Sequence, residues 1–126
     1  MSKRWREELE KILKEMEAGD PDVEASAIVR TDGLVMASAL PKSADEGLIA
    51  AMSAAILNIG SRALSELAKG ELEKIIVSGN KGDITIIGVG KGAVLSAITR
   101  PGANIGLLLV EMARAKEKVQ SLLKSM

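Results

Sequence analysis

The stretch from Ser43 to Lys69 constrains the fold of this chain most, because it is long, largely apolar and free of proline. Ser43 followed by Glu46 three residues later is a capping box, which predicts the start of a helix. The apolar residues that follow recur at steps of three and four, and they form two stripes. The first stripe comprises Ile49, Met52, Ile56, Ile59, Ala63 and Leu67, and the second comprises Ala50, Ala54, Leu57, Ser61, Leu64 and Ala68.

A helix that is apolar on two sides must be buried on two sides. One apolar face is enough to cover a sheet, and the second stripe is rich in small residues that let another backbone come close. The chain has few other helices to wrap this one, so we expect a second copy of the chain to supply the missing cover. The alternative is that it is the central core helix of a monomer.

The composition excludes several classes of protein. A chain of 126 residues predicts one domain, spanning residues 1–126. Lys plus Arg and Asp plus Glu number 17 each, and a nucleic-acid-binding protein should instead show a basic excess. The sequence has no Cys and no His, which removes disulfides, thiolate catalysis, the usual zinc sites and histidine bases. We therefore expect no metal, no cofactor and no nucleic-acid partner.

The N-terminal segment MSKRWREELEK is charged and lacks the apolar core of a signal peptide. No run approaches the ~18 consecutive apolar residues that a membrane span needs. We expect a soluble, cytoplasmic protein without direct membrane insertion.

The remaining segments alternate in type along the chain. Helices are predicted over residues 3–18 and from the Asn104 cap nearly to the C-terminus. An Asp-Gly turn at residues 32–33 predicts a hairpin. The predicted strands are 23–30, 34–39, 72–78, 83–89 and 93–99. We therefore predict an α/β (α+β) sandwich with a five-stranded antiparallel sheet, in the order helix, two strands, helix, three strands, helix. The first and last helices should share one face, and the central helix should cover the other.

No segment of the sequence predicts catalysis. The run from Gly88 to Gly92 suggests a phosphate-binding loop, but it lacks the Walker spacing and leads into a strand, so a hairpin turn is the better interpretation. The carboxylate pairs at Asp20 and Asp22 and at Asp45 and Glu46 are typical of loops and helix starts. We predict that the protein is not an enzyme.

Three segments together resemble one protein family. They are the hairpin VEASAIVRTDGLVMASAL, the meander LEKIIVSGNKGDITIIGVGKGAVLSAIT and the last-helix entry TRPGANIGLLLVEMARA. In this order they are similar to the roadblock / dynein light-chain family, and most closely to its prokaryotic members. The resemblance covers nearly the whole chain and implies a profilin-like roadblock architecture.

The resemblance also implies partners. Family members pair their central helices antiparallel and join their third strands edge to edge, with a second copy or a paralogue. They are non-enzymatic platforms, and prokaryotic members commonly accompany a small Ras-like GTPase whose nucleotide cycle they alter. The predicted dimer interface comprises Ala50, Ala54, Leu57, Ser61, Leu64, Glu73, Ile75 and Val77.

A polar strip remains on the central helix after both apolar stripes are assigned. It comprises Asn58, Arg62, Ser65, Glu66 and Lys69. As a hypothesis, this strip contacts the GTPase, with Arg62 best suited to meet carboxylates in a bidentate way. The alternative is an ordinary solvated face. Two other functions stay open: a structural subunit of a motor- or membrane-associated complex without GTPase regulation, and a small-ligand sensor, against which the scarcity of aromatic residues and the absence of His count.

Overall fold

The computed structural model describes residues 3–125. Along the chain its elements are α1 (Lys3–Gly19), β1 (Val23–Arg30), β2 (Val35–Ala39), α2 (Glu46–Glu66), β3 (Lys74–Gly79), β4 (Gly82–Val89), β5 (Ala93–Thr99) and α3 (Ile105–Lys124). The predicted order of elements is confirmed. The predicted bounds of the first and fifth strands agree with the structure, and the central helix is shorter at both ends than predicted.

All five strands form one antiparallel sheet in the order β2-β1-β5-β4-β3. The first two strands form the predicted hairpin, in which Gly33 adopts a φ of 95° that favours glycine. Gly90, Lys91 and Gly92 connect β4 to β5, so this segment is the predicted hairpin turn. The sheet has two edge strands, β2 and β3, at opposite ends.

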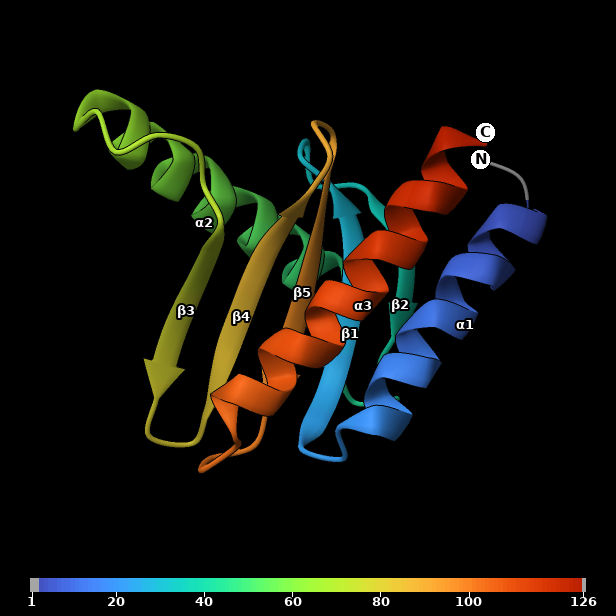
Figure 1. The fold of residues 1–126 in the computed structure, drawn as a ribbon. Coiled ribbons are helices and arrows are strands. Elements are labelled where there is room, and N and C mark those ends of the chain that lie inside the picture. Colours follow the sequence, from blue (N-terminus) through green and yellow to red (C-terminus); the bar gives the residue numbers. More distant parts are fainter. Residues whose placement is uncertain (1–2, 126) are drawn as a thin grey trace.

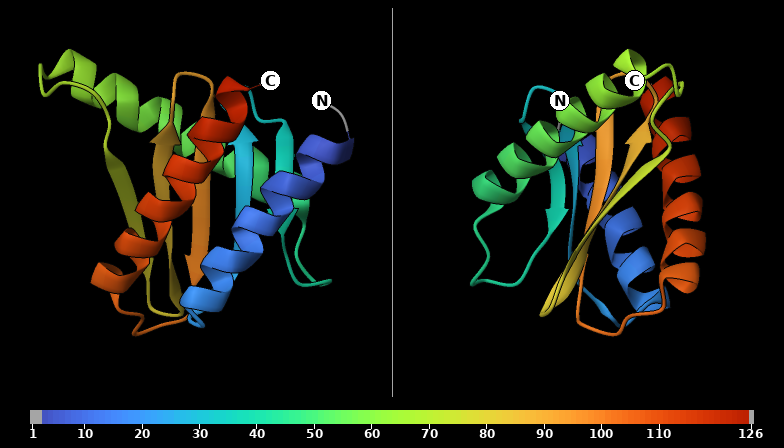
Figure 2. Two further views of the ribbon diagram at one scale, coloured as in Figure 1. Left: turned by 45° about the vertical axis from the view of Figure 1, so that its right-hand side comes forward. Right: turned by 90° about the vertical axis from the view of Figure 1, so that its left-hand side faces the viewer.

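Helices cover both faces of the sheet (Figure 1). Helices α1 and α3 lie together on one face, and α2 crosses the other face, as both views of Figure 2 show. On the first face, Leu9 and Leu13 of α1 and Leu108 and Met112 of α3 form the core with residues of the sheet. This arrangement confirms the predicted division of the helices between the faces. It also leaves α2 without a second helix on its outer side.

The start of α2 differs from the prediction. Asp45 is the N-cap, and its carboxylate accepts a hydrogen bond of 3.0 Å from the backbone N–H of Leu48. The predicted capping box from Ser43 to Glu46 is therefore wrong. Asp45 competes for the same role and lies two residues closer to the first turn, while Glu46 is engaged by other side chains. The predicted cap of α3 is confirmed, since Asn104 accepts from the backbone N–H of Leu107.

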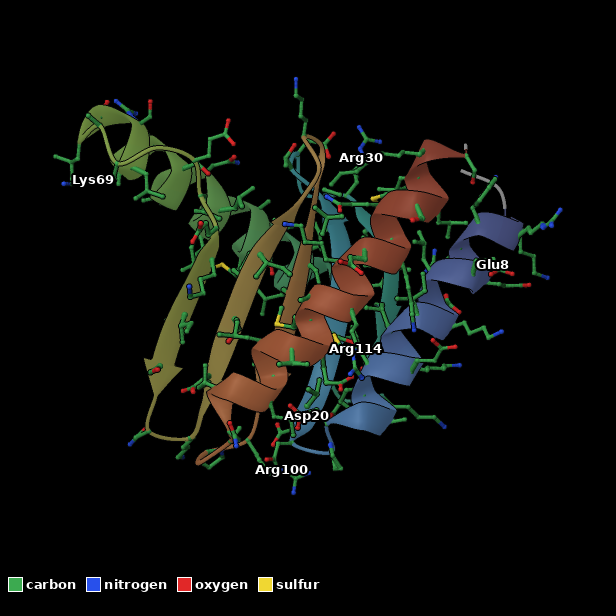
Figure 3. The ribbon with its side chains drawn as sticks, viewed as in Figure 1. Glu8, Asp20, Arg30, Lys69, Arg100 and Arg114 are labelled. Atoms are coloured by element: carbon green, nitrogen blue, oxygen red, sulfur yellow. The ribbon has the colours of Figure 1, made fainter. Side chains whose placement is uncertain are left out.

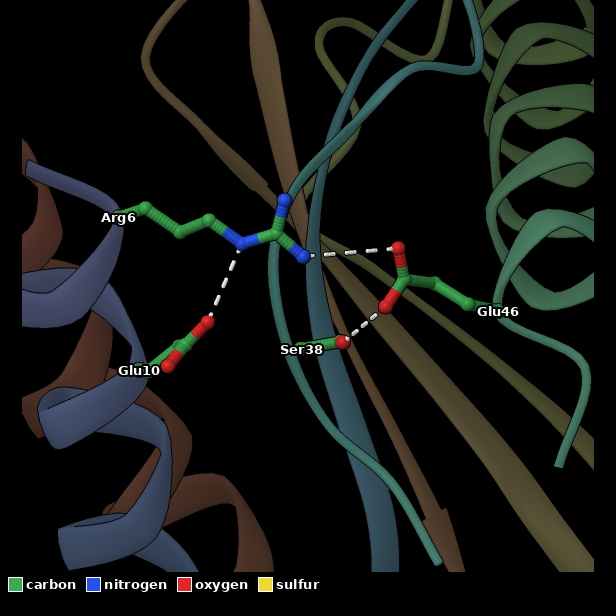
Figure 4. Close-up of polar contacts among 4 residues, drawn as sticks. All are labelled: Arg6, Glu10, Ser38 and Glu46. Carbon is green, nitrogen blue, oxygen red and sulfur yellow. Dashed lines mark hydrogen bonds and ion pairs between the residues drawn. The ribbon is translucent and has the colours of Figure 1, made fainter. Parts of the chain in front are cut away.

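Glu46 joins the two helical layers beside edge strand β2 (Figure 4). Its carboxylate accepts a hydrogen bond from the Ser38 hydroxyl of β2 and lies 3.7 Å from an Arg6 guanidinium nitrogen of α1. Arg6 also pairs with Glu10, at 3.2 Å. Charged and hydroxyl groups thus connect α1, β2 and α2, so this edge of the sheet is flanked by side chains from both layers.

Candidate interaction surface

Four large apolar side chains on the outer side of α2 and at its C-cap, Leu67, are exposed. Leu48 is 58% exposed, Met52 50%, Ile59 72% and Leu67 70%. We call these four residues the α2 crest. With the helical repeat of 3.6 residues per turn, Leu48, Met52 and Ile59 follow the side of α2 that faces away from the sheet, and Leu67 follows directly after the helix. An apolar surface of this kind on a soluble protein marks a binding surface.

The inner side of α2 packs on the sheet of its own subunit. Ala50 is fully buried and Ala54 and Leu57 are buried, while Ser61 and Leu64 are half-buried. The prediction that Ala50, Ala54 and Leu57 form the dimer interface is therefore wrong. Their small or compact side chains let α2 lie close to β1, β4 and β5, where Val29, Ile86 and Val94 complete this second core. Of the first predicted stripe, Ile49 and Ile56 also pack against this core, whereas Met52, Ile59 and Leu67 are exposed.

Gly60 allows α2 to approach the start of the β3 segment. A Cβ atom added at Gly60 would lie 2.7 Å from Cδ1 of Ile75 and 3.2 Å from Cδ1 of Leu72. Figures 1 and 2 show that the C-terminal end of α2 extends beyond β3. The C-terminal part of the α2 crest therefore lies near the β3 edge.

Strand β3 is hydrogen-bonded to β4 on one side only. The β3–β4 connection is a two-residue turn, so Gly79 and Gly82 form the first hydrogen-bonded pair and such pairs alternate from there. Two bonds elsewhere in the sheet fit the same alternation. The Arg30 N–H donates to the Leu34 carbonyl in the β1–β2 hairpin, and the Thr31 N–H donates to the Gly92 carbonyl just before β5. In β3 the alternation directs the backbone N–H and C=O groups of Lys74, Ile76 and Ser78 away from β4, toward the free edge.

The three predicted interface residues of this segment have different positions. Glu73 is exposed and precedes β3, and the side chain of Val77 is exposed. Ile75 instead packs under α2 in the second core, so its side chain does not face a partner. Ile76, on the opposite face of the strand, is exposed. The edge is therefore presented mainly by backbone groups together with Ile76 and Val77.

The polar strip runs along the flank of α2 beside the crest. Arg62 and Glu66 form an exposed ion pair at 3.0 Å. The Asn58 side chain donates to the backbone carbonyl of Thr31 at 3.3 Å, which ties this flank to the β1–β2 hairpin. Ser65 is exposed, and Lys69 lies just past the helix, at the end that projects from the sheet (Figure 3). All five residues predicted for partner binding are thus solvent-accessible.

The crest residues Met52, Ile59 and Leu67 belong to the first predicted stripe, and Leu48 belongs to neither stripe. The size of the side chains is the signal that separates the two stripes, because a helix lies closest to a sheet along its smallest residues. By length and composition α2 is also apolar enough to span a membrane, and 22% of its most apolar 18-residue segment is buried in the structure. A core helix of a soluble protein passes the same test, and α2 is seated on its own sheet. Among residues 3–125, no group of three or more His, Cys, Asp or Glu side chains could hold a metal ion.

Known proteins are consistent with this architecture. A family model described as the Roadblock/LC7 domain matches residues 8–99. The chain belongs to this family. Two proteins of Methanocaldococcus jannaschii, MJ1340 and MJ0310, are each 32% identical over 114 residues, which cover 90% of this chain and 98% of each relative. Together with the bacterial structures below, they confirm the predicted prokaryotic type of roadblock domain.

Several solved structures share the fold of this roadblock domain. MglB of Myxococcus xanthus has a TM-score of 0.90 at 16% identity, with 99% of this chain and 93% of that chain covered. A second MglB structure, described as having a tetrameric arrangement, has the same score and identity. The Roadblock/LC7 domain from Streptomyces avermitilis scores 0.86 at 18% identity, with 91% and 97% covered. Profilin II of Acanthamoeba castellanii scores 0.57 at 13% identity, with 80% and 87% covered, which confirms the profilin-like architecture.

Proposed function

We propose that this roadblock domain is a non-enzymatic scaffold that pairs with a second copy of itself and binds a small Ras-like GTPase. The observation that carries the proposal is the exposed α2 crest on the same side as the free β3 edge. Exposed apolar side chains of the crest and backbone N–H and C=O groups of β3 that bond to no other strand lie on this side. A twin subunit related by a twofold axis covers both at once.

The energetics of both surfaces favour pairing. Burial of exposed apolar side chains gains roughly 25 cal/mol per Å² of area removed from water. A free, partly apolar edge strand tends to pair with another chain, and edge-to-edge pairing with a twin satisfies its outward N–H and C=O groups. The twofold arrangement that the roadblock resemblance implies, with antiparallel central helices and joined third strands, uses both surfaces.

In such a dimer the polar strips flank the twin crests and form the exposed rim of the paired helices. Arg62 presents a planar guanidinium that matches carboxylates of a partner, and its present ion pair with Glu66 is exposed and therefore weak. Exchange of this pair for contacts with a GTPase costs little. We infer that the strip contacts the GTPase, because the crest is occupied by the twin.

The proposed mechanism is differential affinity. A scaffold alters the nucleotide cycle of a GTPase only when it binds the GDP and GTP forms unequally, because a ligand with equal affinity for two states shifts nothing. The roadblock domain supplies no metal, cofactor or covalent step in this proposal. Its contribution is a rigid two-subunit surface that favours one arrangement of the switch regions.

The test is calorimetric titration of the chain with small Ras-like GTPases of the same organism, each loaded with GDP or with a non-hydrolysable GTP analogue. Arg62→Ala should weaken binding at least about tenfold, as the loss of an arginine anchor does. Arg114→Ala is the matched control, since Arg114 is a comparably exposed helical arginine, paired with Glu111, on the opposite layer (Figure 3). Equal loss in both variants, or no loss with Arg62→Ala, contradicts the assignment of the strip.

Comparison of the GDP-loaded and GTP-analogue-loaded GTPases distinguishes a regulator from a simple tether. Unequal affinity for the two nucleotide states supports a regulator, whereas equal affinity leaves a tether. A dimer that binds none of the GTPases supports the structural assembly subunit, which uses the same crest and edge without GTPase regulation.

A further inference from the structure

A cavity beside the β4–β5 hairpin, on the α3 side of the sheet, is not used by the proposed pairing. It lies between the β4–β5 hairpin, the adjoining ends of β1 and β2, and the C-terminal turns of α3, and has a volume of about 380 Å³. Its apolar lining comes from Met36, Val89, Ala93 and Leu123, which belong to or pack against the core under α1 and α3. The size is at the small end of the ~300–1,000 Å³ range of ligand pockets.

The charged groups of this cavity all have one sign. Arg30, Lys91 and Lys124 are in its lining, and no Asp or Glu is. Four other surface cavities of the described chain each include at least one Asp or Glu in the lining. In a chain with 17 basic and 17 acidic residues, three cations without an acid around one apolar hollow are a local segregation of charge.

The cations retain capacity for an anion. Lys91 and Lys124 form no ion pair within residues 3–125. Arg30 pairs with Asp32 at 2.6 Å, and both side chains are about half exposed, so this pair is weakened by solvent. Figure 3 shows Arg30 beside the C-terminal half of α3 at this end of the sheet. The negative end of the α3 dipole, equivalent to roughly half a charge, is outweighed by three full positive charges.

We propose that this cavity binds a small amphipathic anion, with a carboxylate or phosphate head group and a short apolar tail. The tail occupies the hollow between Met36, Val89 and Leu123, and the head group lies at the rim near Lys91 and Lys124. An apolar interior with a few convergent polar groups is the usual composition of a ligand site. The occupant is a free small molecule, because a volume of about 380 Å³ matches a small ligand and not a protein surface. The proposal is independent of the GTPase and of the dimer.

The test is titration of the ¹⁵N-labelled full chain with sodium octanoate and with octyl phosphate, followed by NMR. We expect saturable shifts of the Met36, Ala93 and Leu123 amides with a Kd on the order of 1 mM or tighter. Acetate, which has the head without the tail, and 1-octanol, which has the tail without the head, should each bind at least about tenfold more weakly. Equal binding of octanol, or of acetate, overturns the proposal, as does no saturation by octanoate.

Substitution of the two rim lysines distinguishes binding at this cavity from non-specific attraction of anions to a positive charge. Lys91→Gln combined with Lys124→Gln should weaken octanoate binding about tenfold. The thermal midpoint should fall by no more than a few degrees, because both side chains are exposed and Lys124 only complements the α3 dipole. Lys81→Gln is the matched control, since Lys81 is an exposed lysine of the other hairpin, between β3 and β4. Unchanged binding in the double variant, or equal loss with Lys81→Gln, overturns the site. Binding to vesicles of phosphatidylcholine and phosphatidylserine without octanoate binding also overturns it.

Discussion

The two edges of the sheet are treated differently by this sequence. At β2, the Arg6 and Glu46 side chains bridge α1 and α2, and the Ser38 hydroxyl donates to Glu46. The ladder between β1 and β2 also shifts register between Ile28 and Val29, which interrupts the regular edge. At β3, only β4 is a neighbour, and exposed Ile76 and Val77 follow each other along the strand.

This difference between the edges favours association with another subunit through β3 and disfavours it through β2. A register shift, short length and nearby charges are the usual means by which an edge strand avoids pairing with another chain. All three are present at β2, and the β3 edge lacks the shift and the bridging charges. One closed edge and one open edge permit a pair, whereas two open edges permit an open-ended chain of subunits. The open edge is also the one nearest the projecting end of α2.

The largest expected effect follows from charging the open side. The double variant Met52→Glu, Ile59→Glu places two carboxylates on the α2 crest, where both side chains are exposed in the subunit and fold stability is not affected. Two such positions at about 2 kcal/mol each weaken self-association about a thousandfold. Sedimentation velocity at micromolar concentration should then show a single subunit instead of a dimer.

The matched control places the same two charges on the opposite layer. Leu107 and Val110 of α3 are also exposed and apolar, so Leu107→Glu, Val110→Glu has the same change in charge. We expect this variant to remain a dimer. If it dissociates as readily as the crest variant, net charge is the cause and the α2 crest is not the interface.

A smaller effect is expected from proline at the open edge. Ile76→Pro removes a backbone N–H that points away from β4, so it removes no hydrogen bond within the subunit. Self-association should weaken about tenfold, and urea unfolding of the isolated subunit should change little. Ser38→Pro is the equivalent change at the closed edge, and it should lower stability without any change in the dimer. Equal weakening of the dimer by both variants contradicts the distinction between the edges.

The fold followed from the sequence because local patterns and global architecture agree. Alternating strands, the Asp-Gly turn and the Asn104 cap each have a local cause, and each is present in the structure. The start of α2 was predicted at the wrong residue because Asp45 and Ser43 are both good caps. Only the tertiary contacts of Glu46 with Ser38 and Arg6 show that the carboxylate has another role.

The interaction surface followed only in part. Periodicity showed that α2 has two apolar sides, but it carries no information on which side meets the sheet. The small residues Ala50 and Ala54 suit a close neighbour of either kind, a twin helix or the sheet of the same subunit. The sheet occupies that side, so the larger residues Met52 and Ile59 remain outside. Periodicity shows which residues share a face of a helix, but only the tertiary packing shows which face contacts the sheet.

A modest effect is expected from removing the charge of Glu46 at the closed edge. Glu46→Gln keeps an oxygen that accepts from the Ser38 hydroxyl and removes the charge that attracts Arg6. Because the Arg6 pair is partly exposed and 3.7 Å long, the free energy of unfolding should fall by less than about 1 kcal/mol. Urea unfolding in low and high salt measures this, and the difference between variant and parent should shrink in high salt. A difference that salt leaves unchanged points to lost packing instead of lost charge.

The smallest effect concerns how α1 is held on the sheet beside the closed edge. Burial raises the pKa of the Glu17 carboxyl, although the hydrogen bond donated by the Ser26 hydroxyl opposes this. The folded state therefore holds this proton more tightly than the unfolded state, and its contribution to stability is lost as pH rises from the ordinary glutamate pKa through the raised one. Glu17→Gln should raise stability at pH 7 by about a few tenths of a kcal/mol, given partial exposure, and by nothing near pH 4.

Glu15, two residues earlier on α1, provides a control of opposite sign. A hydrogen bond from Lys118 of α3, together with its charge, lowers the pKa of the Glu15 carboxyl. Its contribution to stability is present above the ordinary glutamate pKa and is lost as pH falls through the lowered one. Glu15→Gln should therefore lower stability at pH 7, where Glu17→Gln raises it. Urea unfolding of both variants between pH 4 and pH 7 distinguishes the cases. Neither variant should alter the dimer, since both residues belong to α1, which lies on the face of the sheet opposite α2 (Figure 1).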